Sequence, residues 1–201
     1  MLRRPLVLLL SVALAVVLAG GALAANVKVR VEGKTQTIYG STQPGLRADN
    51  ALQALDVASV AGEFHYALTT SSFGDYVSQI GKYAAAENTG WAFKVNGVSA
   101  PVGADKVVLK DGDVVLWYHA TFGPGGGPPT LELKRLPGNC YLVESVNDAG
   151  RRSRAANATL VSGKRRVRAP QGRACIGKHT DLVRAVAARV RRPASFTDWT
   201  T

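Results

Sequence analysis

The sequence predicts an α+β fold, in which one main helix packs on a mixed sheet and a small, mostly antiparallel β-sandwich module follows. Three observations predict this fold. Apolar and polar residues alternate in several short stretches, one stretch has apolar residues at helical spacing, and a Gly/Pro-rich segment at residues 123–130 divides the chain. With 46% hydrophobic and 19% charged residues, the 201-residue chain has the composition of a globular protein.

The first 24 residues have the pattern of a secretory signal peptide. Arg3 and Arg4 precede the apolar residues 6–18, and the triplet 22–24 fits an A-x-A cleavage site. We expect cleavage near Ala24, which makes the mature protein secreted or associated with the cell envelope. The alternative is an uncleaved anchor, because the apolar stretch is almost long enough to span a bilayer.

Residues 25–122 are expected to form the first domain. Residues 26–32 alternate polar residues with valine and predict a strand, and residues 35–39 are its predicted hairpin partner. Asp49 is expected to cap a helix that ends near Ala61.

The rest of this domain is predicted to consist of strands. The Asn96-Gly97 pair is typical of a type I′ hairpin turn, and residues 110–113 predict a second turn. One helix packed across a mixed, twisted sheet is a β-grasp-like arrangement. The predicted strands cover residues 64–68, 72–80, 91–95, 107–109 and 114–118.

These elements carry a family resemblance. Residues 90–97 (GWAFKVNG) and 109–118 (LKDGDVVLWY), preceded by residues 51–55 and 73–77 in the same order, resemble the transcobalamin-like C-terminal domain family. The resemblance covers nearly all of residues 26–122 and implies a domain related to soluble-ligand-binding β-grasp proteins. In transcobalamins this domain helps to enclose cobalamin together with a large helical barrel, for which this chain has no room. Cobalamin is therefore an alternative ligand only.

Four aromatic residues are candidate ligand-binding residues, because aromatic rings can stack on a ligand or line an apolar wall: Trp91, Phe93, Trp117 and Tyr118. The alternative is that they pack in the core, as large aromatic residues on strands usually do. Since Trp117 and Tyr118 are neighbours on one strand, they point to opposite faces, and at least one is expected outside the core or at its edge.

The sequence contains no pattern that predicts catalysis or metal binding. Asp111 and Asp113 flank a turn glycine, but their spacing is far short of a calcium-binding EF-hand loop. His65 and His119 have no spaced Ser, Cys or carboxylate that completes a catalytic triad. With two Cys and three His far apart, we expect neither an enzyme nor a Cys/His metal site.

Residues 131–201 are expected to form a basic β module that loosely resembles Ig-like or carboxypeptidase-regulatory-like domains. Short strands are predicted at residues 140–146, 158–161, 167–169 and 174–176, whereas residues 181–192 fit either a helix or a strand. Cys140 and Cys175 are the only cysteines, and export to an oxidising compartment favours a disulfide between them.

The positive charge of the chain lies almost entirely in this module. Residues 131–201 carry fifteen Lys and Arg against five Asp and Glu, whereas residues 25–130 carry eight against nine. A basic face suits phosphate, carboxylate or sulfate groups, so an anionic cell-envelope polymer or membrane surface is the expected partner; the alternative is a solvated surface. Nucleic acid is not expected, because no base-stacking motif accompanies the arginines. The candidate polyanion-binding residues are Arg151, Arg152, Arg165, Arg166 and Arg168.

Together these patterns predict a secreted, non-enzymatic binding protein. Its first domain is expected to offer a ligand- or surface-binding face, and its basic module is expected to adhere to the cell envelope. No cofactor is expected. The alternative function is that of a small-ligand carrier for cobalamin or another corrinoid.

Overall fold

The protein is built mainly from β-strands. The computed structural model describes residues 24–40, 44–71, 74–124 and 126–187, and these contain fifteen strands, one α-helix and one 3-10 helix. The predicted α+β class, with a β-grasp-like first domain and one main helix, is therefore wrong: several sheets dominate, in a β-sandwich type of architecture. The physical reason is that the single 11-residue helix covers only one face of one sheet, whereas the C-terminal half contacts the other face through Lys94 and Glu32.

Two predictions fall wholly or partly outside this description. The signal peptide lies outside the described residues except at its last position, Ala24. Of the segment that fits either a helix or a strand, residues 184–187 form a strand and residues 188–192 lie outside the described part. Within the described ranges, no helix has the length and apolar character needed to cross a membrane.

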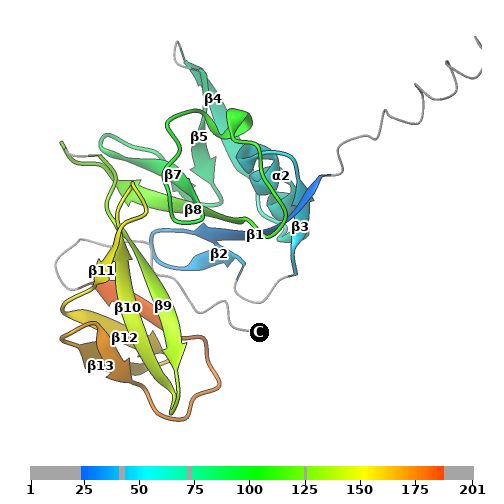
Figure 1. The fold of residues 1–201 in the computed structure, drawn as a ribbon. Coiled ribbons are helices and arrows are strands. Elements are labelled where there is room, and N and C mark those ends of the chain that lie inside the picture. Colours follow the sequence, from blue (N-terminus) through cyan, green and yellow to red (C-terminus); the bar gives the residue numbers. More distant parts are fainter. Residues whose placement is uncertain (1–23, 41–43, 72–73, 125, 188–201) are drawn as a thin grey trace, which may run out of the picture.

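The N-terminal half, defined as residues 24–122, contains two sheets and the helix α2 (Figure 1). The first sheet has five strands in the order β2-β1-β8-β7, with β3 also paired to β1; only β1 and β8 run parallel. The second is the antiparallel sheet β4-β5-β6. The elements are β1 (Ala25–Glu32), β2 (Thr37–Tyr39), β3 (Leu46–Ala48), α2 (Ala51–Ala61), β4 (Tyr66–Ser71), β5 (Gly74–Ile80), β6 (Tyr83–Ala84), β7 (Thr89–Val95), η1 (Ala104–Lys106) and β8 (Val114–Thr121).

Local sequence explains where these elements begin and end, with two differences from expectation. The helix cap is Asn50 rather than Asp49, because the Asn50 Oδ1 atom accepts a hydrogen bond from the Gln53 backbone at 2.8 Å. The expected hairpin between residues 107–109 and 114–118 does not form. Instead, β8 inserts between β1 and β7, and Val108 makes an isolated bridge to Asn50.

The C-terminal half, defined as residues 130–187, consists of two antiparallel sheets around a shared apolar core. In one sheet β10 pairs with β9 on one edge and with β11 and β14 on the other; the second sheet has the order β13-β12-β15. The predicted disulfide between Cys140 and Cys175 is confirmed, and it joins β10 to β14. The strands are β9 (Thr130–Leu136), β10 (Cys140–Val146), β11 (Arg152–Arg154), β12 (Ala158–Ser162), β13 (Arg165–Ala169), β14 (Arg173–Cys175) and β15 (Arg184–Ala187).

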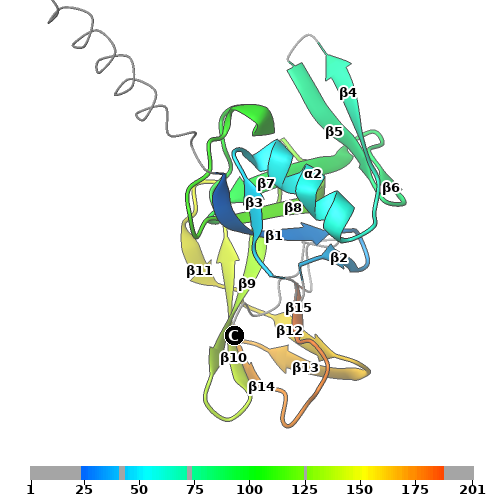
Figure 2. The same ribbon diagram turned by 90° about the vertical axis from the view of Figure 1, so that its right-hand side faces the viewer.

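The five-stranded sheet lies between α2 and the C-terminal half (Figure 2). On the side of α2, Val27, Val29 and Val31 of β1 are buried in the main core. The polar residues that alternate with these valines would normally face water, but Arg30 and Glu32 are at most 1% exposed. Both faces of this sheet are therefore covered.

Arg30 and Glu32 form an ion pair within the buried layer. The Thr37 hydroxyl donates to both Glu32 carboxylate oxygens at 2.9 and 3.0 Å, which adds acceptor contacts for the carboxylate. Arg184 of β15 reaches the same carboxylate across the two halves, with its Nη2 atom 3.9 Å from Glu32 Oε2. The pairing compensates for part of the cost of removing these charges from water.

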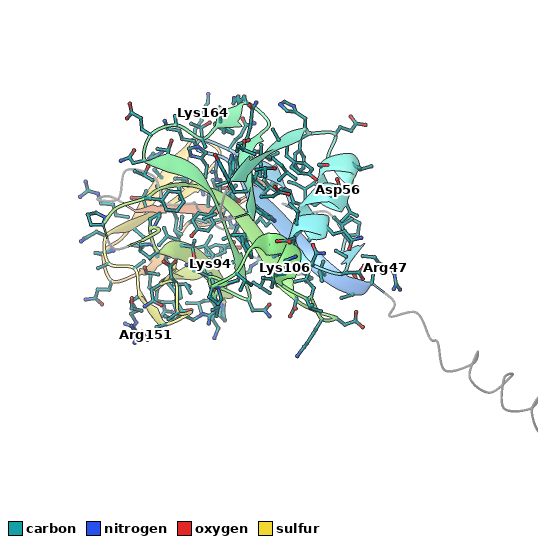
Figure 3. The ribbon with its side chains drawn as sticks, turned by 90° about the horizontal axis from the view of Figure 1, so that it is seen from above. Arg47, Asp56, Lys94, Lys106, Arg151 and Lys164 are labelled. Atoms are coloured by element: carbon teal, nitrogen blue, oxygen red, sulfur yellow. A yellow bond between two sulfur atoms is a disulfide. The ribbon has the colours of Figure 1, made fainter. Side chains whose placement is uncertain are left out.

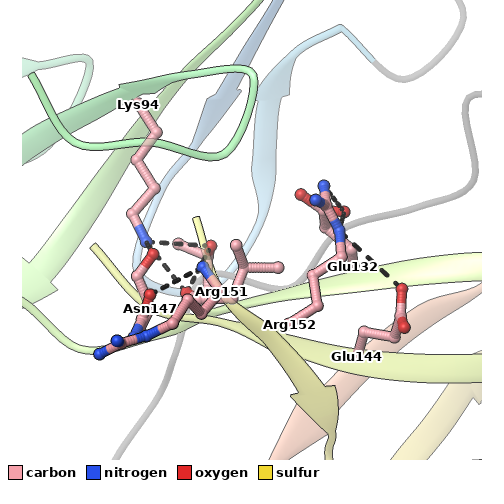
Figure 4. Close-up of polar contacts among 8 residues, drawn as sticks. Lys94, Glu132, Glu144, Asn147, Arg151 and Arg152 are labelled. Carbon is pink, nitrogen blue, oxygen red and sulfur yellow. Dashed lines mark hydrogen bonds and ion pairs between the residues drawn. The ribbon is translucent and has the colours of Figure 1, made fainter. Parts of the chain in front are cut away.

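Lys94 of β7 is the second buried charge between the halves, and its side chain is 0% exposed. Its Nζ atom donates to the backbone oxygens of Val146 and Asn147 at 3.0 and 3.1 Å and lies 3.4 Å from Asp148 Oδ1 (Figure 4). Burial lowers the pKa of the Lys94 ammonium group, and the Asp148 carboxylate opposes that change. Every one of these acceptors belongs to the C-terminal half.

Neighbouring contacts extend this interface. The Ser99 backbone and hydroxyl groups donate to the backbone oxygen and the carboxylate of Asp148 at 2.8 and 2.9 Å. The connecting segment also packs closely, because a side chain at Gly127 would come within 3.3 Å of the Tyr118 hydroxyl oxygen. At this position the absence of a side chain therefore meets a packing requirement.

We predict that Lys94→Met destabilises the whole protein. The substitution fills a similar volume but leaves one buried and one partly buried backbone oxygen without their charged donor, at a cost of about 2 kcal/mol. Chemical denaturation measures this loss. Lys106→Met is the control, because Lys106 is exposed and should leave the free energy of unfolding unchanged. Equal stability of Lys94→Met and the wild type would contradict a structural role for this lysine.

Candidate functional site

The four candidate aromatic residues occupy two different interiors. Trp91, Phe93 and Trp117 pack on the helix side of the sheet, where the rings of Phe93 and Trp117 have centroids 5.1 Å apart. Tyr118 points the opposite way and is 1% exposed in the layer between the halves. The indole nitrogens of Trp91 and Trp117 donate to the backbone oxygens of Tyr83 and Ala51. These four side chains do not form one common wall.

His119 lies among these aromatic rings. Its ring meets that of Trp91 edge-on at 5.4 Å, and it lies 6.1 Å from the ring of Tyr83. Its Nε2 atom donates weakly to the Ala84 backbone oxygen at 3.4 Å. Burial lowers the pKa of His119 below its ordinary 6.5, the hydrogen bond to Ala84 opposes this, and Lys34 contributes to the lowering.

The arginine candidates at the start of β11 are not equivalent. The guanidinium group of Arg152 donates to Glu132 Oε2 at 2.8 and 3.2 Å, and its Nε lies 4.0 Å from Glu144 (Figure 4). The exposed Arg151 is hydrogen-bonded through its backbone to Asn147. Arg152 is therefore paired with carboxylates of its own sheet, whereas the Arg151 side chain is exposed to solvent.

The remaining arginine candidates lie on β13, away from this pair. In Figure 3, Lys164 beside β13 and Arg151 lie on opposite sides of the molecule. Along β13, Arg166 and Arg168 are exposed on one face, while Arg165 points to the other face, which continues to the buried Ala169. The five candidates thus form two separate basic regions.

Arg165 belongs to a groove of about 310 Å³ in the C-terminal half. Two turns form this groove, one between β12 and β13 and one between β14 and β15. Such a volume is at the small end of the range for small-molecule sites. The lining residues, called here the basic groove, are Ser162, Lys164, Arg165, Lys178, His179, Thr180 and Asp181.

Several contacts fix the walls of the basic groove. The Nη1 atom of Arg165 donates to the backbone oxygens of Ile176 and Lys178 at 2.7 and 3.1 Å. His179 Nδ1 donates to the Gly177 backbone oxygen at 2.7 Å, and its Nε2 atom is hydrogen-bonded to the Tyr141 hydroxyl at 3.0 Å. Because Tyr141 is buried in the core of the half, it holds the His179 ring in one orientation.

The disulfide also restrains the groove. The turn that carries Lys178 and His179 directly follows Cys175, which is linked to Cys140 on β10. The next residue, Ile176, donates from its backbone to the Asn139 oxygen at 3.0 Å. The cationic side chains therefore project from a backbone that is ordered before any ligand arrives, and such an arrangement lowers the entropy cost of binding.

Sequence reasoning identified the basic character of this region but not the groove. Lys164 and Lys178 were members of a long basic stretch, and nothing in their spacing distinguished them. Thr180 and Asp181 carried no signal of their own. The glycines at positions 163 and 177, both with positive φ angles, mark the two turns. The sequence does not show that these two turns lie side by side.

The family comparison concerns the N-terminal half. Residues 45–121, which run from the residue before β3 to the end of β8, match a family described as Domain of unknown function (DUF4430). This match covers less than half of the chain and names no activity. No curated protein matches the sequence.

Among solved structures, one from Ruminococcus gnavus ATCC 29149 is similar to part of the chain. It is described as a candidate metal-binding protein, is 14% identical, and has a TM-score of 0.38 over 49% of this chain and 99% of its own. Likeness at this level identifies neither a shared fold nor a shared metal site. In the described part of this chain, no three His, Cys, Asp or Glu residues are grouped so as to hold a metal ion.

The lowered pKa of His119 predicts an acid-dependent loss of stability. Because the buried ring resists protonation, the unfolded chain binds this proton at a higher pH than the folded protein. Stability should therefore fall as the pH decreases below about 6.5. Denaturation at pH 7.5 and 5.5 should show a larger loss for the wild type than for His119→Phe. Equal losses would contradict the prediction.

Proposed function

We propose that this protein is a secreted, non-enzymatic binding protein whose C-terminal half adheres to an anionic polymer of the cell envelope. The single observation that supports this most strongly is the basic groove, with exposed arginines on the same half. Arg166 and Arg168 are exposed on β13, and Arg151 is exposed at the opposite side. Arginine donates to carboxylate and phosphate groups in a fork geometry that suits such polymers.

The compartment in this proposal has independent support. The Cys140–Cys175 disulfide is of a kind that persists in oxidising environments. Export through a cleaved signal peptide remains part of the proposal, as does the absence of catalytic activity.

The N-terminal half is assigned no ligand in this proposal. We infer that it is a transcobalamin-like domain, an inference supported by the residue pattern and by the DUF4430 match. Corrinoid binding is not proposed, because three of the candidate aromatic side chains pack in the core beside α2. Tyr118 is buried on the opposite face of the sheet, beside Lys94 and near Asp148 of the C-terminal half.

Retention on an immobilised anionic polysaccharide tests this function. We expect the wild type to elute only at raised salt, because charge attraction between exposed groups is screened. The triple variant Arg151→Gln, Arg166→Gln, Arg168→Gln should elute at clearly lower salt. The matched control replaces three exposed lysines of the N-terminal half, Lys34, Lys82 and Lys110, with Gln, and should elute close to the wild type. Equal effects of the two variants would contradict adhesion through the C-terminal half.

A further inference from the structure

We propose that the basic groove is a discrete site for a sugar unit that carries an acidic group, such as a uronic acid or a sugar phosphate. This inference rests on the proposed function and names the chemical unit of the polymer that the C-terminal half recognises. It depends on the mixture of charges and hydroxyl groups in the groove, which differs from a uniformly basic surface.

Three cations in the groove suit an acidic group. Lys164, Arg165 and Lys178 converge on it from two turns. Among the described residues, neither Lys164 nor Lys178 has a carboxylate within ion-pair distance. The Nη1 atom of Arg165 donates hydrogen bonds to two backbone oxygens, and these bonds orient the guanidinium plane. An acidic group would thus meet two exposed ammonium groups beside one guanidinium group whose orientation is fixed.

Asp181 distinguishes a sugar from a simple anion. Its carboxylate lines the same groove and makes no ion pair with any described residue. A negative charge at this position repels a bare phosphate or sulfate ion, so it weakens a site meant only for anions. A carboxylate is, however, a strong acceptor for hydroxyl groups. A ligand that carries both an acidic group and hydroxyl groups satisfies the lysines and Asp181 at once.

The hydroxyl and imidazole groups of the groove are also consistent with binding of an acidic sugar. Thr180 is exposed at the groove and can both donate and accept. The Ser162 hydroxyl instead donates to the Asp181 backbone oxygen at 3.1 Å and so fixes the position of the Asp181 main chain. His179 supplies the only ring in the lining, and its orientation is held by Tyr141. A groove without Trp, Tyr or Phe offers no stacking platform for nucleic-acid bases.

The test compares two ligands of similar charge by titration calorimetry at physiological ionic strength. Oligogalacturonate carries a carboxylate and hydroxyl groups on every ring, whereas polyphosphate carries charge without hydroxyl groups. We expect the wild type to prefer oligogalacturonate. The variant Lys164→Gln, Lys178→Gln should lose at least about tenfold in affinity for it, since two charge-assisted contacts disappear. The control Lys134→Gln, Arg173→Gln removes two exposed charges from the outer face of the other sheet and should bind almost as the wild type does.

Asp181→Asn provides the sharper comparison, because simple electrostatics and sugar recognition predict opposite signs. We expect weaker binding of oligogalacturonate and stronger binding of polyphosphate. Stronger binding of both ligands, or equal losses in the groove variant and its control, would overturn the sugar site and leave general adhesion intact. Binding to phosphatidylglycerol vesicles but not to oligogalacturonate would also overturn it. If the wild type bound no anionic polymer at all, the proposed function itself would fail.

Discussion

The buried ammonium group of Lys94 requires acceptors, and the C-terminal half supplies them. Without the backbone oxygens of Val146 and Asn147, this charge would lie on an open face of the five-stranded sheet. The Arg30–Glu32 pair imposes the same requirement on β1, which lies two strands from Lys94 in that sheet, and Arg184 approaches this pair from β15. Buried charges tolerate little misplacement, because each lost partner leaves an uncompensated group in a poorly solvated layer. These contacts therefore fix how the two halves meet.

This arrangement determines which surfaces remain for binding. One face of the five-stranded sheet is covered by α2, and the other is covered by the C-terminal half, so the aromatic residues of the sheet serve packing. In the function that we propose, the anionic partner binds surfaces of the C-terminal half that point away from this interface. There the disulfide and the bonds of Arg165 and His179 hold two turns together, and the basic groove forms between them.

The sequence pattern predicted individual elements better than it predicted their assembly. Alternation of valine with polar residues correctly indicated β1, and the apolar spacing of residues 51–61 correctly indicated α2. The same alternation implied that Arg30 and Glu32 face water, and it could not reveal that a distant part of the chain covers them. The fold class failed for the same reason, since it depended on how the strands combine into several sheets. The disulfide was predictable, because only two cysteines are present. The groove was not, because its residues come from two turns that only the folded backbone brings together.

The most direct test asks whether the two halves unfold together. In a Trp199→Phe background, tryptophan emission reports on Trp91 and Trp117, both in the N-terminal half. Replacing Cys140 and Cys175 with serine removes a link confined to the C-terminal half and should destabilise that half by roughly 3–4 kcal/mol. If the buried charges couple the halves, the denaturation midpoint seen by the tryptophans should fall together with the midpoint seen by far-UV circular dichroism. A tryptophan transition that stays at its wild-type midpoint would contradict this account.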